Sequence, residues 1–308
     1  MVFTGRPGSS ARVKRRPLAG LLLILPLAAL ADNALPPYVL QWPESSSDLL
    51  VAETSAATLH HYSRAADGDI VHEQIYMSVG ENGVGKQREW DKLTPLGIYV
   101  VTSELDTSRL HEKYGVRAFP LDYPNARDRQ LGRTGSGIWL HGVLPGGERR
   151  PERDTDGCLA IPNEDLLALS PRVKPGDTTV IIARELPQAG AAGQAVVRDA
   201  LLDRLETWRA ALQQGDLRAL RALYRDDFIY EGLDRDTWLS TGYSDLVRDA
   251  GSVELSEPLL AADPEEPGLY ISRFKLTTKK GPQSRALIKR LYWQRDDDGY
   301  RIIAEDAF

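Results

Sequence analysis

The segment Thr155-Asp156-Gly157-Cys158 contains the only cysteine of this 308-residue chain, and the pair His141-Gly142 precedes it by one loop. A thiol attacks a carbonyl carbon only as its thiolate, so a catalytic cysteine needs a base nearby. His141 ends a short apolar stretch that is typical of a strand, and the loop that follows can bring the imidazole back to Cys158. Glycine at position 157 lets other backbone approach the thiol closely. The pattern therefore indicates cysteine acyl transfer.

The same residues also have a purely structural interpretation. Free cysteine is among the most buried residue types. Cys158 would then be a small core hydrophobe, and His141 a hydrogen-bonded core histidine. The spacing of the two residues by itself leaves both interpretations open.

The N-terminal residues have the features of a secretory signal peptide, which we predict to span residues 1–31. Four basic residues lie between Arg12 and Arg16, an apolar run follows from Leu18 to Leu30, and a small-x-small cleavage pattern ends at Ala31. The run is shorter than the ~20 residues that span a bilayer. The mature chain is therefore expected in a bacterial periplasm, without a transmembrane segment. An uncleaved N-terminal anchor is the alternative.

The composition excludes some classes of partner. Hydrophobic residues make up 42% of the chain and charged residues 27%, as in ordinary globular proteins. The formal net charge of −6 gives no sign of a basic surface for nucleic acid. His60, His61 and His72 lie on predicted strands without the carboxylate spacing of a metal site. We therefore expect neither a nucleic-acid partner nor a bound metal.

Changes in composition divide the rest of the chain. Residues 32–47, rich in Pro and Ser, are predicted to be a linker. Strand-like runs separated by Gly and Pro turns predict a β-rich domain over residues 48–185. A second linker at residues 186–194 leads to residues 195–308, where a helical apolar period gives way to three strand-like runs. This last part is expected to be α+β, with helices packed on a curved antiparallel sheet.

Five blocks of the β-rich part occur in the order of a known family. They are an opening hairpin at Leu50–Tyr62, the segment Thr94–Tyr99, the pair His141-Gly142, the motif Thr155–Cys158, and a closing helix and strand at 163–182. Together they resemble the L,D-transpeptidase catalytic domain, also called the YkuD domain, over about residues 49–184.

The resemblance implies a role for each site residue. Cys158 matches the nucleophile that takes the acyl group of a peptidoglycan tetrapeptide stem, at the bond between the L-centre of diaminopimelate and the terminal D-Ala. His141 matches the base, and Gly142 the residue whose carbonyl orients that base. Thr155 matches the hydroxyl of the motif, and the backbone at Gly157 and Cys158 matches the oxyanion hole. Stem peptides are thus the expected partner, and no metal or organic cofactor is implied.

Two positions differ from the common pattern of this family. Asp156 replaces a basic or aromatic residue, and Ala160 stands where many members have an arginine suited to a substrate carboxylate. A branch with a similar D-G-C-[LI]-A signature includes L,D-carboxypeptidases, which trim tetrapeptides to tripeptides in cell-shape control. We expect the acyl chemistry of the L,D-transpeptidase family, with L,D-carboxypeptidase activity as a close alternative. A non-catalytic wall-binding protein is a further one.

The C-terminal part shows a second, weaker resemblance. Trp208, Gly215-Asp216, Leu223-Tyr224 and Phe228 follow a spacing that resembles the NTF2-like (SnoaL-like) fold, in which helices wrap a curved sheet around a cavity. An adaptor or chaperone built on this domain is another class of function. Five aromatic residues either line such a cavity or fill a core; they are Trp238, Tyr243, Tyr270, Tyr292 and Trp293.

Overall fold

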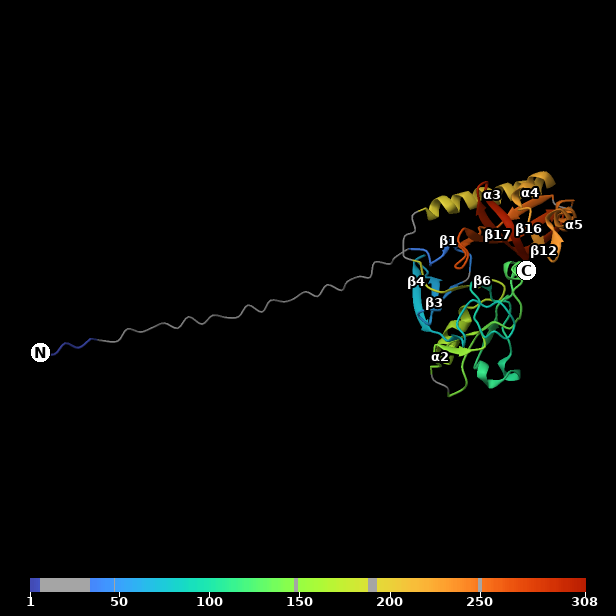
Figure 1. The fold of residues 1–308 in the computed structure, drawn as a ribbon. Helices are drawn as coiled ribbons and strands as arrows, with labels where there is room; N and C mark the ends of the chain where they lie inside the picture. The colour runs from blue at the N-terminus through green and yellow to red at the C-terminus, as the bar shows by residue number, and fades with distance from the viewer. Residues whose placement is uncertain (6–33, 47, 147–148, 188–192, 249–250) are drawn as a thin grey trace. The chain divides into compact units, whose positions relative to one another are not determined.

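The computed structural model describes residues 1–5, 34–46, 48–146, 149–187, 193–248 and 251–308 (Figure 1). The predicted signal peptide lies outside the described residues, apart from its first five positions. Within the described part of the chain, no helix is long and apolar enough to cross a membrane.

A five-stranded sheet, here called the central sheet, organises the N-terminal domain. Its strands, in spatial order, are β4 (Ile70–Tyr76), β3 (Thr58–Arg64), β2 (Leu49–Glu53), β11 (Thr179–Ala183) and β6 (Gly97–Val100). Strand β11 runs parallel to β2 and antiparallel to β6, while β2, β3 and β4 form an antiparallel meander. Strands β6 and β11 are buried along their whole length, which indicates that both faces of the sheet are covered.

A smaller sheet holds the motif around Cys158. Its strands, in spatial order, are β10 (Leu159–Ala160), β8 (Trp139–His141) and β7 (Ala118–Pro120). Strands β8 and β10 are parallel, with Ala160 opposite His141, so Cys158 lies directly before a strand that runs beside the histidine. Strand β5 (Val79–Gly80) pairs with β9 (Arg153–Thr155) nearby.

Short helices connect these strands. The α-helices are α1 (Ala126–Gln130) and α2 (Asn163–Leu169), and the 3-10 helices are η1 (Thr107–Arg109), η2 (Glu112–Tyr114) and η3 (Ser170–Arg172). A capping box in which Asn125 and Asp128 exchange hydrogen bonds starts α1.

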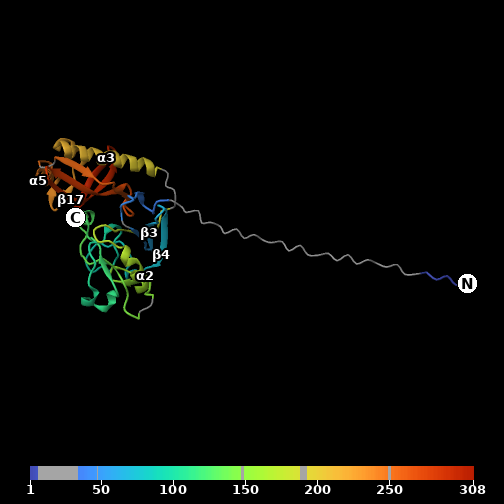
Figure 2. The same ribbon diagram turned by 180° about the vertical axis from the view of Figure 1, so that it is seen from behind.

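The C-terminal domain is α+β, as predicted. Its helices are α3 (Gln194–Gln214), α4 (Leu217–Leu223) and α5 (Arg235–Arg248), and its hairpin consists of β12 (Ile229–Tyr230) and β13 (Leu233–Asp234). The C-terminal sheet contains β14 (Ser252–Leu255), β15 (Leu259–Ala262), β16 (Leu269–Lys280), β17 (Gln283–Asp296) and β18 (Gly299–Ala307). Figures 1 and 2 show α3 lying across this sheet. Asp216 caps α4 by accepting a hydrogen bond from the backbone N–H of Ala219.

The aromatic residues of this domain fill a core. Trp208, Phe228, Tyr243 and Trp293 are buried between the helices and the sheet, and Trp238 and Tyr270 pack against them. Their polar atoms are satisfied internally, since the buried carboxylate of Glu305 accepts hydrogen bonds from Tyr224, Trp238, Tyr243 and Lys289.

The segment predicted as a linker at residues 32–47 is partly structured instead. Strand β1 (Val39–Gln41) pairs antiparallel with β15, and Val39, Leu40 and Trp42 are buried. The Pro- and Ser-rich composition concealed this short strand. This strand covers the edge of β15, which would otherwise expose a row of unpaired backbone N–H and C=O groups.

The two sheets share one apolar layer. Alternate residues of a strand point to opposite faces, so Leu50 and Ala52 of β2 face the core of the N-terminal domain, whereas Leu49 and Val51 face the C-terminal sheet. We call this second cluster the interdomain layer. Its buried members are Val39, Trp42, Leu49, Val51, Tyr62, Ile98, Ala126, Ile181, Leu259, Ala261, Leu269, Ile271, Tyr292, Ile303 and Ala304.

Candidate active site

All five site residues predicted from the sequence lie together around one cavity of about 670 Å³. Cys158, His141 and Thr155 line it, and Gly142 and Gly157 are their chain neighbours. The remaining lining residues are Glu81, Lys86, Glu89, Trp90, Lys92, Lys113, Tyr114, Gly135, Ser136, Gly137, Trp139, Arg150, Asp154 and Asp156.

The thiol of Cys158 is sheltered at the wall of this cavity. The residue is 7% exposed, and its Sγ donates a hydrogen bond to the carbonyl of Gly137 at 3.4 Å. Burial raises the pKa of the thiol to about 11, although the backbone of Trp139 and the charge of Lys113 oppose the rise. The resting cysteine is therefore protonated near neutral pH.

The imidazole of His141 has a defined tautomer. Its Nδ1 lies 2.6 Å from the carbonyl oxygen of Gly142, which can only accept, so Nδ1 bears the proton and Nε2 the lone pair. Burial, with smaller contributions from the cations Arg150 and Lys113, lowers the pKa of His141 to about 4, although the hydrogen bond to Gly142 opposes the shift. The ring of Tyr114 packs edge-on against the imidazole at 5.1 Å. Cysteine and histidine thus rest as an uncharged pair.

Asn163 holds the turn that follows His141. Its Oδ1 accepts a hydrogen bond from Val143 N at 3.0 Å, and its Nδ2 donates to Val143 O at 2.9 Å. A Cβ atom at Gly142 would lie 2.2 Å from that Oδ1, so only glycine fits here. Asn163 is the first residue of α2 and not its N-cap, because Pro162 occupies that position without a side-chain cap.

Thr155 and Gly157 shape the turn before the thiol. Thr155 Oγ1 donates to the carbonyl of Cys158 at 2.8 Å and accepts from Gly157 N at 3.1 Å. Gly157 has φ +120°, and a Cβ there would lie 2.7 Å from the carbonyl oxygen of Leu93. The hydrogen-bonding capacity of the Gly157 N–H is therefore used by the Thr155 hydroxyl in this structure.

The cations that line the cavity are paired with carboxylates. Each of the four cations among its lining residues has a carboxylate partner: Lys86–Asp91 at 2.7 Å, Lys92–Glu81 at 2.5 Å, Lys113–Asp156 at 3.1 Å and Arg150–Asp154 at 2.8 Å. The charge of Asp156 is therefore balanced by Lys113. Sequence reasoning noted Arg150 only as a flanking residue and missed the lysines, because nothing in their local sequence marks them as neighbours of Cys158.

A match to a known protein family covers the part of the chain that forms this cavity. Residues 50–182 match the model of the L,D-transpeptidase catalytic domain, YkuD. Residues 50–182 are thus similar to this family, and we call this part of the chain the YkuD domain. Among curated proteins, no sequence matches the chain significantly.

Solved structures share the fold beyond the YkuD domain. Bd1075 of Bdellovibrio bacteriovorus is 24% identical, with a TM-score of 0.69 over 89% of this chain and 97% of that one. The helical cell shape determining protein Pgp2 of Campylobacter jejuni is also 24% identical, with a TM-score of 0.71 over 90% of this chain and 97% of that one. An NTF2-like protein from Shewanella oneidensis matches 36% of this chain and 97% of its own, with 16% identity and a TM-score of 0.30. The fold class expected from the sequence, a β-rich part followed by an α+β part, is confirmed.

Position 160 of the YkuD domain does not face the cavity. Ala160 is buried in β10 opposite His141 and is bridged to Ser78. The cavity obtains its positive charge from other elements, including Lys86 before β6 and Lys113 in η2. The missing arginine therefore does not leave the cavity without cations.

Several other histidine and arginine side chains have local structural roles. His111 caps η2 through the N–H of Lys113, and Arg133 pairs with Asp128 at 2.9 Å. His60 bonds to His72 at 2.9 Å and to Glu53 at 3.1 Å. No group of His, Cys, Asp and Glu residues with metal-site geometry occurs in the described ranges.

Proposed function

We propose that this protein is a cysteine-dependent enzyme that acts on peptidoglycan stem peptides. It would form an acyl-enzyme at the bond between the L-centre of diaminopimelate and the terminal D-Ala of a tetrapeptide stem. One observation supports this most strongly: Cys158 and His141 line the same cavity from adjacent parallel strands, and Gly142 holds the histidine in the tautomer of a base. The family match over residues 50–182 supports the same chemistry.

The first step in this proposal is proton transfer. The lone pair on Nε2 of His141 takes the thiol proton as Sγ of Cys158 attacks the carbonyl carbon of diaminopimelate. A sulfur–carbon bond forms, and the carbonyl electrons move to oxygen. When the tetrahedral intermediate collapses, the bond to the D-Ala nitrogen breaks, and His141 gives that nitrogen its proton. An acceptor then attacks the thioester and frees the thiol.

The oxyanion is assigned to the backbone N–H of Cys158. The resemblance implied a donor at Gly157 as well, yet that N–H is bound to the hydroxyl of Thr155. Thr155 therefore acts through the turn, because its hydroxyl binds both the N–H of Gly157 and the carbonyl of Cys158. A backbone N–H aimed at the developing charge is worth several kcal/mol in such sites, ~3 for one donor.

Hydrolysis is a second candidate for the fate of the acyl-enzyme. Transfer requires a second acidic stem to remain bound until its amine attacks, and each of the four lining cations already has a carboxylate partner. This pairing favours water as the acceptor and L,D-carboxypeptidase activity. Because Pgp2, whose fold this chain shares, determines helical cell shape, we also propose a role in cell shape. The enzyme would work in the periplasm after removal of residues 1–31.

The test is incubation of the purified protein with disaccharide tetrapeptide, followed by mass spectrometry of the products. Tripeptide with free D-Ala and no dimer would show hydrolysis, and a 3-3 crosslinked dimer would show transfer. Cys158→Ala and His141→Ala should both abolish turnover. His111→Ala is the matched control, because that imidazole caps η2 outside the cavity and should leave turnover unchanged.

Full turnover by Cys158→Ala would refute the enzyme proposal. Binding of the stem without any product, in both wild type and Cys158→Ala, would instead support a non-catalytic wall-binding protein.

A further inference from the structure

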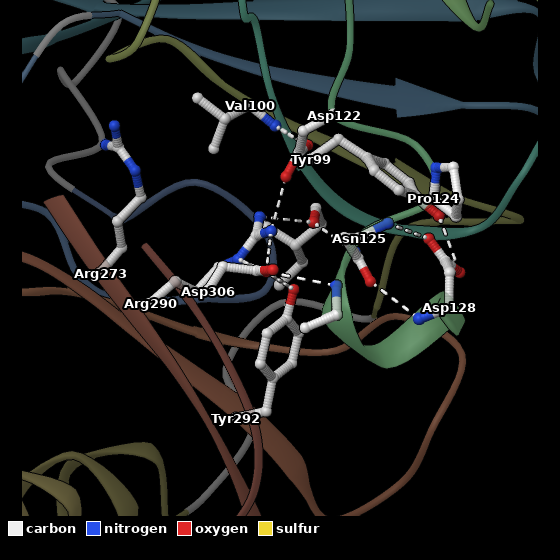
Figure 3. Close-up of polar contacts among 12 residues, drawn as sticks. Tyr99, Val100, Asp122, Pro124, Asn125, Asp128, Arg273, Arg290, Tyr292 and Asp306 are labelled. Atoms are coloured by element: carbon white, nitrogen blue, oxygen red, sulfur yellow. Dashed lines mark hydrogen bonds and ion pairs between the residues drawn. The ribbon is translucent and has the colours of Figure 1, made fainter. Parts of the chain in front are cut away.

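Helix α1 belongs to the YkuD domain, yet the C-terminal domain holds it in place (Figure 3). Asp306 of β18 accepts a hydrogen bond from the N–H of Ala126 at 3.3 Å, and its other oxygen accepts from Arg129 at 2.9 Å. Arg127 also binds Glu266 of the C-terminal domain, with Nε at 3.0 and 3.2 Å from the two carboxylate oxygens. Both ends of this short helix are thus tied to the other domain.

Asp306 is itself fixed by two neighbours on β17. Arg290 Nε lies 3.1 Å from Asp306 Oδ2, and the hydroxyl of Tyr292 donates to the same oxygen at 3.0 Å. Arg290 is 0% exposed and reaches Asp122 of the YkuD domain at 2.5 Å. Removing one member of such a buried network leaves an uncompensated charge, so the arrangement resists displacement.

The position of α1 determines where the residues that follow it lie. The backbone N–H of Arg133 donates to the carbonyl of Asp128 at 2.9 Å, and the guanidinium of Arg133 pairs with the Asp128 carboxylate at 2.9 Å. Thr134 follows, and its backbone N–H donates to Gln87 O at 3.1 Å. Its hydroxyl accepts from Glu89 N at 3.2 Å. A shift of α1 would therefore move two segments, around residues 87–90 and 133–137.

Both segments are walls of the catalytic cavity. Glu89 and Trp90 line it from one segment, and Gly135, Ser136 and Gly137 line it from the other. The carbonyl of Gly137 accepts the hydrogen bond of the Cys158 thiol. The contacts thus run without a break from Asp306 to the reacting sulfur.

We propose that Asp306 is a positioning residue for the reaction at Cys158. Held by Arg290 and Tyr292, it anchors α1 and thereby sets the cavity wall that receives the thiol. The C-terminal domain is then a structural part of the active site, although none of its described residues lines the cavity. The proposal rests on the cysteine chemistry proposed above, and it names the residues through which the appended domain acts on that chemistry.

Another contact across the interdomain layer provides a matched control. Arg273 of β16 is also a buried arginine and donates to the carbonyl of Asp177 at 3.1 Å. Asp177 precedes β11, and the described contacts of Arg273 do not involve α1. Figure 3 shows Arg273 apart from the network around Asp306. Arg273→Met should therefore weaken the interface without moving the cavity wall.

The experiment compares Asp306→Ala, Asp306→Asn, Arg129→Met and Arg273→Met in the full chain. Two readouts are taken well below each thermal midpoint: the rate at which iodoacetamide alkylates Cys158, and kcat and KM on disaccharide tetrapeptide. Asp306→Ala and Arg129→Met should lower kcat about 10-fold or more, because displacement of reacting groups costs that much. They should also raise the alkylation rate severalfold as the wall loosens. Asp306→Asn keeps an acceptor for Ala126 N and should recover part of kcat.

The outcomes separate this proposal from the one on which it depends. Equal changes in Arg273→Met and Asp306→Ala at matched fraction folded would overturn the positioning role, as would wild-type kcat and alkylation in Asp306→Ala. If Asp306→Ala does not fold, Arg129→Met provides the test. The side chain of Arg129 is half-exposed, so we expect the fold to tolerate its removal. Alkylation of Cys158 needs no substrate. Its rate therefore reports on the cavity wall even if full turnover by Cys158→Ala shows that the proposed function is wrong.

Discussion

At the residue scale, the proposed chemistry depends on two groups that are both uncharged at rest. Many thiol enzymes rely on a preformed thiolate, whereas here burial raises the pKa of Cys158 to about 11 and lowers that of His141 to about 4. The base is therefore present in its active neutral form above pH 4, and the thiol keeps its proton until it is removed during attack. Asp156 cannot serve as the activating group, because a nearby negative charge raises the pKa of a thiol.

We predict a wide plateau in the pH dependence of kcat/KM. Protonation of His141 removes the base, so activity should fall as the pH decreases through about 4, well below the ordinary histidine value of about 6.5. The measurement is kcat/KM on disaccharide tetrapeptide across that range, with circular dichroism to exclude acid unfolding. An acid limb centred near 6.5 would contradict the buried, neutral histidine.

The reactivity of the thiol should depend on the same imidazole. His141→Ala removes the proton acceptor, so we expect slower alkylation of Cys158 by iodoacetamide near neutral pH. His111→Ala, a substitution of a histidine that only caps η2, should alkylate at the wild-type rate. Equal rates in His141→Ala and wild type would remove His141 from the mechanism.

At the scale of elements, the turn between β9 and β10 presents the nucleophile. Its geometry requires glycine at position 157, where φ is +120° and the carbonyl of Leu93 lies where a Cβ would be. Thr155 and Thr94 bind the two peptide groups of this glycine. The turn is therefore rigid because its hydrogen bonds are made within the fold and not by substrate.

We predict that Gly157→Ala is more harmful than the substitution of another positive-φ glycine whose Cβ position has no contact. A positive φ costs a non-glycine residue ~1–3 kcal/mol where the conformation is enforced, and the contact with Leu93 O adds to this. Gly146 is the control, because its φ is +74° and nothing lies within 4 Å of the position that a Cβ would take there. Urea unfolding should show a clearly larger loss of stability for Gly157→Ala, with turnover lost. Equal losses would mean that the contact with Leu93 is relieved without cost.

At the scale of the whole molecule, the interdomain layer joins the two domains into one folding unit. The central sheet is buried on both faces, and its second face is covered by the C-terminal sheet and β1. Domains connected by a small polar contact usually move independently, whereas a large apolar interface opposes such motion. Arg290, Asp122 and Asp306 add a buried ionic network within the same interface.

We therefore predict a single cooperative unfolding transition for residues 34–308. Calorimetric and van't Hoff enthalpies should agree, as for a two-state protein. A chain that ends at residue 187 would expose the apolar face of the central sheet, so we expect it to aggregate or to lose its fixed tertiary structure. Two separated transitions, or a stable and monomeric truncated chain, would show that the domains fold independently.

The site could be predicted from the sequence more fully than its surroundings could. Cys158, His141 and their glycines could be predicted because the chemistry needs those residue types at a short, local spacing. The lysines of the cavity could not, since Lys86 and Lys113 reach the thiol only after separate loops have packed together. The strand Val39–Gln41 was missed for a similar reason, because its partner β15 lies more than 200 residues later in the chain.

The sequence by itself determined the candidates for nucleophile and base, the family that the N-terminal domain resembles and the α+β character of the C-terminal one, because each depends on local patterns of residues. Only the tertiary structure decided that Asn163 holds the turn after His141, that Gly157 N–H binds Thr155, and that the two sheets share one layer. The contact of Ala126 with Asp306 joins residues 180 positions apart. Such contacts depend on how apolar faces pack, and packing is a property of the whole fold that no local pattern contains.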